Sequence, residues 1–87
     1  MSAGAIQVVG TVLDSTGHPA AGATVMWLHG PVPLPDLAQL TQADGGFVMS
    51  APVAGRYRLG CRGDPGGQAA LDVTVGPQGA RVTVRLT

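Results

Sequence analysis

The sequence predicts an all-β fold: a seven-stranded antiparallel β-sandwich with Greek-key connections, formed by one domain over residues 1–87. Three observations support this prediction. Apolar and polar residues alternate with a period of two along most of the chain, as in strands that bury one face. Turn-forming residues are abundant, with 14 Gly and 7 Pro, and they separate short segments as in sandwich folds. A chain of 87 residues is long enough for one modest core.

The strands are assigned from this alternation. They are predicted at residues 6–13, 23–29, 37–42, 47–51, 56–61, 69–75 and 81–87. The third segment is short, and a single helical turn is the alternative there. The last segment alternates most regularly, with Val82, Val84 and Leu86 on one face.

The predicted connections contain residues that favour turns. Asp14 can accept backbone hydrogen bonds in an Asx-turn, and Gly17 can supply a positive φ in the same connection. Asp44 and Gly45 form an Asp-Gly pair, which favours a type I′ hairpin turn between the third and fourth strands. Gly55 ends the turn before the fifth strand.

Two segments, GTVLDSTGHPAAGATVMW and TQADGGFVMSAPVAGRYRL, resemble the carboxypeptidase regulatory-like domain family. The matching positions are Gly10, Val12, Asp14, Gly17, Pro19, Gly22, Ala23, Val25, Thr41, Asp44, Gly45, Phe47, Pro52, Gly55, Tyr57 and Leu59. The resemblance covers nearly the whole chain and implies a transthyretin-like (prealbumin-like) β-sandwich. It implies little about function, because such domains are appended to many unrelated proteins.

The predicted core contains Ala23, Val25, Phe47, Tyr57 and Leu59. Ala23 is small enough to let the two sheets approach, while Phe47 and Tyr57 fill the space between them. A buried Tyr57 needs a partner for its hydroxyl group, most simply a backbone carbonyl at a strand corner.

Composition argues against several classes of partner. Five basic and five acidic residues give zero net charge, and the five Arg are scattered, so neither nucleic acid nor a membrane surface is an expected partner. The N-terminal residues lack the features of a secretory signal, and no apolar stretch is long enough for membrane insertion. We therefore expect a cytoplasmic protein if the chain is complete, and an extracytoplasmic one if it is part of a longer exported protein.

No catalytic site is predicted. Cys61 with His18 or His29 could suggest a thiol nucleophile and its base, but Cys61 falls in phase with the inward residues of its strand and is expected to be buried. The hydroxyisourate-hydrolysing relatives of transthyretin have His- and Arg-containing motifs and a Tyr-Arg-Gly-Ser-type ending, whereas this chain ends in VRLT. We expect a protein that is not an enzyme and needs no cofactor.

Two further motifs favour simpler interpretations. Four acidic residues in predicted turns, Asp14, Asp36, Asp44 and Asp64, could converge on Ca²⁺. The spacing of a calcium loop is absent, so hydrogen bonding to the turns is favoured and no metal site is predicted. The tripeptide RGD at residues 62–64 could serve integrin recognition, but chance occurrence in a Gly-rich loop is favoured.

The segment 23–29 is apolar on both faces, with Ala23, Val25 and Trp27 on one and Met26 and Leu28 on the other. A two-layer sandwich buries only one face of each sheet, so the second face is expected either to contact another molecule or to be covered by the Pro-rich loop 30–36. The predicted interface residues are Met26, Leu28, Val32 and Leu34.

These observations predict a non-catalytic structural or protein-interaction module. It would be an accessory subunit or appended domain that contacts its partner through strand 23–29 and loop 30–36. The partner would be another protein, a larger complex or a second copy of the chain. The alternative is a carbohydrate-binding or cell-surface accessory module, in which Trp27 would be the aromatic ring left for a sugar.

Overall fold

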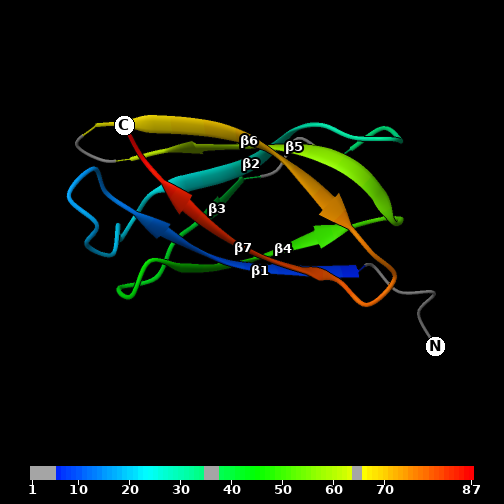
Figure 1. Cartoon of the computed structure of the whole chain (residues 1–87), viewed down its shortest axis with the longest axis horizontal. Coiled ribbons are helices and arrows are strands. Elements are labelled where there is room, and N and C mark those ends of the chain that lie inside the picture. Colours follow the sequence, from blue (N-terminus) through cyan, green and yellow to red (C-terminus); the bar gives the residue numbers. More distant parts are fainter. Residues whose placement is uncertain (1–5, 35–37, 64–65) are drawn as a thin grey trace.

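The computed structural model describes residues 6–34, 38–63 and 66–87, which form two facing β-sheets (Figure 1). The strands are β1 (Ile6–Leu13), β2 (Thr24–His29), β3 (Ala38–Leu40), β4 (Gly46–Ala51), β5 (Gly55–Arg62), β6 (Gln68–Val75) and β7 (Ala80–Arg85). Within these described ranges there is no helix with the length and apolar character needed to cross a membrane.

One sheet has three strands in the order β4-β1-β7, and the other has four in the order β3-β2-β5-β6. In Figure 1, β2, β5 and β6 lie in the upper layer and β1, β4 and β7 in the lower one. The predicted seven-stranded sandwich is confirmed, and the described part of the third segment is a strand rather than a helical turn. One pairing differs from the antiparallel expectation, because β1 and β7 run parallel. β7 reaches β1 from β6 in the opposite sheet, so no hairpin constrains its direction.

The turn before β4 differs from the type I′ prediction, which is wrong. Asp44 and the residue before it have negative φ, whereas Gly45 has φ 79°. The Gly45 N–H donates to the Gln42 carbonyl over 2.9 Å, so the geometry is that of a type I turn followed by a left-handed glycine. The physical reason is tertiary, because the turn joins strands of two different sheets. A Cβ at Gly45 would also press against the Val12 carbonyl of β1.

The space between the sheets is filled by side chains from every strand except β3. The buried apolar residues are Val8, Val12, Ala23, Val25, Phe47, Met49, Ala51, Tyr57, Leu59, Cys61, Val73, Val75, Val84 and Leu86. Phe47 lies opposite Gly10 of β1, and a Cβ at Gly10 would overlap the Phe47 ring. Glycine at that position therefore makes room for the largest apolar side chain of β4.

Tyr57 lies at the other end of the core, and its exposed fraction is only 1%. Its hydroxyl group donates to the carbonyl oxygen of Val53 over 2.7 Å and accepts from the Val53 N–H over 3.3 Å. The backbone carbonyl expected as its partner is therefore found in the turn that precedes β5. These bonds tie that turn to the core.

Thr41, just after β3, attaches the edge of the four-stranded sheet to the start of β2. Its hydroxyl group donates to the Ala20 carbonyl, and it accepts from the Ala23 N–H over 2.8 Å. The Thr41 N–H donates to the Ala23 carbonyl over 2.9 Å. Short β3 is thereby held beside β2, which extends the sheet by one strand.

Candidate functional site

The outer face of the four-stranded sheet, which points away from the sandwich, has an apolar centre. Val25 of β2 is buried between the sheets, and strand alternation therefore turns Met26 outward. Across the sheet, Met26 lies beside Ala38 of β3 on one side and Gly60 of β5 on the other, and Gly60 pairs with Ala70 of β6. Because Ala38, Gly60 and Ala70 have short side chains or none, the centre of the outer face is a depression.

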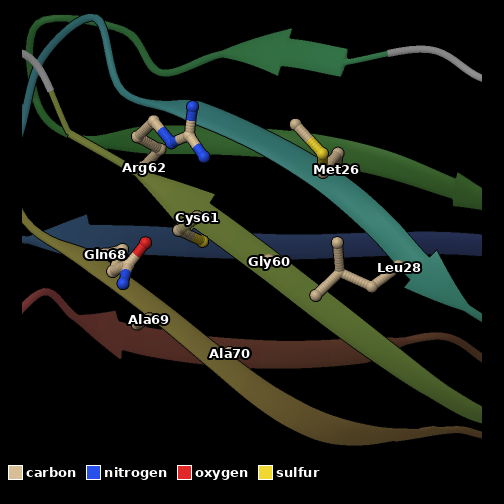
Figure 2. Close-up of a pocket in the computed structure, with 8 residues that line it drawn as sticks. All are labelled: Met26, Leu28, Gly60, Cys61, Arg62, Gln68, Ala69 and Ala70. Carbon is tan, nitrogen blue, oxygen red and sulfur yellow. The ribbon is translucent and has the colours of Figure 1, made fainter.

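Leu28 stands beside these small residues. Its exposed fraction is 51%, and a Cβ at Gly60 would come within about 2.9 Å of the Leu28 Cδ1 and Cγ atoms. In Figure 2 the Leu28 side chain extends from β2 toward β5 next to Gly60. The result is a shallow hollow of about 350 Å³, which we call the β5 groove. It is lined by Met26, Leu28, Gly60, Cys61, Arg62, Gln68, Ala69 and Ala70.

Three Arg side chains of β5 share this outer face. Arg56, Arg58 and Arg62 are exposed and alternate with the buried residues of the strand. Asp72 of β6 lies opposite Arg58, and its Oδ1 atom is 3.0 Å from the Arg58 Nη1. Among the residues that the structure describes, one carboxylate faces three guanidinium groups, so the described part of this face carries an excess of positive charge.

The described part of the Pro-rich loop, residues 30–34, does not cover Leu28. Residues 27–34 line a second hollow of about 550 Å³, which shares Leu28 with the β5 groove. Leu34 packs against the core, and its Cδ1 atom lies close to Gly30, as does the Tyr57 ring. Val32 is half-buried. The described part of the loop therefore leaves Leu28 half exposed, while Pro35 and Asp36 lie outside the described residues.

Trp27 of β2 connects the two sheets. Its indole N–H donates to the carbonyl oxygen of Ser50 in β4 over 2.9 Å. Its ring centroid is 4.8 Å from that of Tyr57, with an angle of 40° between the ring planes. The ring is partly buried in these contacts and so is poorly placed to stack on a sugar.

Cys61 is buried, as its place in the alternation predicts. Burial raises the pKa of its thiol to about 11, so the nucleophilic thiolate is disfavoured at neutral pH. His18 lies in the turn after β1 and His29 at the end of β2, and both are exposed. The structure offers no support for a thiol nucleophile at this position.

Two acidic residues stabilise turns through hydrogen bonds. Asp14 accepts from the Thr16 hydroxyl and from the backbone N–H groups of Thr16 and His18. The Thr16 hydroxyl and then the His18 N–H are the main causes that lower the pKa of Asp14. Asp44 accepts from the Gly46 N–H over 2.8 Å.

No cluster of three or more potential metal ligands occurs among the residues that the structure describes. Asp36 and Asp64 lie outside those residues, so their part in the calcium question stays a prediction. The same holds for the RGD tripeptide, of which only Arg62 and Gly63 are described.

Part of this face was not predicted from the sequence. Met26 and Leu28 were predicted to point outward, but nothing was assigned to Gly60 or to the Arg residues of β5. The signal was present in the segment RYRLGCR, where inward Tyr57, Leu59 and Cys61 require the remaining residues to point outward. Leu40 has an exposed fraction of 67%. Its exposure was not predicted, because segment 37–42 could be either a strand or a helical turn and the two place Leu40 differently.

The family model of the carboxypeptidase regulatory-like domain matches residues 7–87. No curated protein matches the chain significantly. Domains of the matched family are generally non-catalytic. Since the family model spans nearly all of the sequence, the chain belongs to the carboxypeptidase regulatory-like domain family.

Proposed function

We propose that this domain is a non-catalytic protein-interaction module, an accessory subunit or appended domain of a larger assembly. Its partner would sit on the outer face of the four-stranded sheet. The observation that carries the proposal is the exposed fraction of Leu28, 51%, beside Met26 and above Gly60. Single exposed apolar residues are ordinary, but a contiguous apolar surface around a hollow is typical of interaction sites.

The absence of catalysis is part of the proposal. The family is generally non-catalytic. The thiol of Cys61 is buried and its pKa is raised, which makes it a poor nucleophile. The outer face combines aliphatic, glycine and Arg residues, a composition that suits recognition of a protein surface.

The Pro-rich loop would extend this contact. Val32 is half-buried in the hollow that shares Leu28 with the β5 groove. Leu34, by contrast, packs on the core and would support the loop rather than touch the partner. We therefore propose Met26, Leu28 and Val32 as contact residues and Leu34 as a supporting residue.

Size-exclusion chromatography of host lysate would test this proposal with two variants. Leu28→Asp places a charge at the centre of the proposed contact. Val48→Asp places the same charge on the opposite sheet, at a residue of similar exposure, 48%. We expect the wild type and Val48→Asp to elute in one larger assembly and Leu28→Asp to elute as free domain. A free wild-type domain, or equal behaviour of the two variants, would contradict the proposal.

A further inference from the structure

We propose that the occupant of the β5 groove is an extended, acidic segment of another protein, with aliphatic side chains between two carboxylates. This inference rests on the proposed function and specifies the chemistry of the partner. It follows from the charge on the face, the shape of the groove and the spacing of the Arg residues along β5.

The positive charge of the described outer face indicates that the partner's surface is acidic. The described residues of the outer face include three Arg, at positions 56, 58 and 62, and one Asp, at position 72. Asp72 already forms an ion pair with Arg58 at 3.0 Å. The chain as a whole is neutral, so the described part of this face is more positive than the average of the chain. Positive potential around a contact favours carboxylates on the incoming surface and disfavours basic ones.

The shape of the groove favours a narrow occupant with aliphatic side chains. Ala70 and Gly60 form its floor, with the Leu28 side chain lying against Gly60 and Met26 on the β2 side. Figure 2 shows Arg62 at one end of this groove, with its side chain extending toward β2. In the strand register, Arg62 of β5 pairs with Gln68 of β6. Small aliphatic side chains fit such a floor and bury apolar surface against Leu28.

The spacing of the Arg residues sets the spacing of the carboxylates. Arg62 and Arg56 are six residues apart on one strand, and at about 3.3 Å per residue this is roughly 20 Å. Arg56 and Arg58 line a further hollow of about 270 Å³ at the other end, together with His29 and Asp72. An extended segment lying along β5 would therefore place one carboxylate at each end and two aliphatic side chains between them.

A second copy of the chain fits this face less well. A face-to-face dimer would bring the Arg residues of one β5 over those of the other, and among the described residues only Asp72 of each copy would offset them. Like charges at a contact oppose association. Charge complementarity therefore favours a different, acidic partner.

Two synthetic peptides with blocked ends would test the inference by NMR titration of the isotope-labelled domain. One is Glu-Ser-Leu-Ser-Leu-Ser-Glu, which in extended form presents both Glu and both Leu on one side. The other has Lys in place of Glu. At low salt, we expect the Glu peptide to bind at least about tenfold more tightly, with shifts in β2, β5 and β6 amides that weaken as salt rises.

Charge reversal gives the decisive comparison. The double variant Arg56→Glu, Arg62→Glu is expected to reverse the preference and bind the Lys peptide more tightly. The matched control is Arg81→Glu, Arg85→Glu, which changes the net charge equally on exposed residues of β7 in the other sheet. We expect this control to keep the wild-type preference.

Several results would overturn the inference. The domain could bind neither peptide, or bind the Glu and Lys peptides equally. The control variant Arg81→Glu, Arg85→Glu could lose the preference for the Glu peptide as fully as the β5 variant does. Self-association of the domain could also shift the same β2, β5 and β6 amides. None of these would by itself overturn the proposed function, because the lysate experiment with Leu28→Asp reports on partner contact whatever the partner's charge.

Discussion

The side chain of Leu28 lies against the backbone of Gly60, so closely that a Cβ at residue 60 would come within about 2.9 Å of Leu28 Cδ1. A similar relationship exists inside the core, where a Cβ at Gly10 would overlap the ring of Phe47. The two glycines differ in the side chain that an added Cβ would displace, which is Leu28 at Gly60 and Phe47 at Gly10. Leu28 is half exposed and can turn aside, whereas Phe47 is enclosed by the core.

This difference predicts effects of different size for two matched substitutions. Gly60→Ala should change the free energy of unfolding by less than about 1 kcal/mol, since strand propensity offsets the displacement of Leu28. Gly10→Ala should lower the free energy of unfolding by about 1–3 kcal/mol, because the core must adjust around Phe47. Urea denaturation of both variants would measure this. Equal changes in the free energy of unfolding would contradict the prediction, because they would show that the burial of Phe47 and the exposure of Leu28 make no difference.

Phe47 is expected to be essential for folding at this domain size. Its exposed fraction is 4%, and Phe47→Ala should lower the free energy of unfolding by about 3–5 kcal/mol, enough to unfold a marginally stable small domain. Circular dichroism and thermal melting would measure the effect, with Phe47→Leu as the milder comparison. A Phe47→Ala variant with an unchanged melting temperature would show that Phe47 does not stabilise the core.

The hydroxyl group of Tyr57 should contribute a smaller, separable amount of stability. Tyr57→Phe removes both hydrogen bonds to Val53 while leaving the buried ring in place. We expect the free energy of unfolding to fall by about 1 kcal/mol, with no change in the dependence on urea concentration. A value near zero would mean that water replaces the hydroxyl group at Val53.

The Cys61 thiol should make the stability of the domain depend on pH in alkaline solution. Its pKa in the folded state is about 11, above the ordinary value of 9.0, because burial disfavours the thiolate. The contribution to stability is therefore complete below about pH 9 and is lost as pH rises toward 11. The loss is on the order of 2 kcal/mol. Cys61→Ala should lack this component, and identical pH profiles for both proteins would contradict the assignment.

Much of the fold could be predicted because alternation is a local property of the chain. The segment RYRLGC places Tyr57, Leu59 and Cys61 inward whatever surrounds it, and all three are buried. The same segment contains outward Arg56 and Arg58, and Arg62 follows it directly. These Arg residues were not assigned to a surface because the sequence does not show which strands lie beside them. Their grouping depends on the order β3-β2-β5-β6, which no local pattern reveals.

Other features required knowledge of the tertiary structure. The turn at Gly45 follows from the passage of the chain between two sheets and from the nearness of the Val12 carbonyl. The parallel pairing of β1 and β7 follows from a crossover rather than a hairpin. Leu34 points to the core because its loop folds back near Tyr57, a contact between residues more than twenty positions apart.

Site-specific photo-cross-linking tests most directly whether the outer face of the four-stranded sheet binds the partner. Benzoylphenylalanine would replace Leu28 in one variant and Thr83, an exposed residue of β7 in the other sheet, in the second. After irradiation in host cells, we predict one adduct of discrete mass from position 28 and none from position 83. Adducts of equal yield from both positions, or an adduct from position 83 alone, would contradict the account.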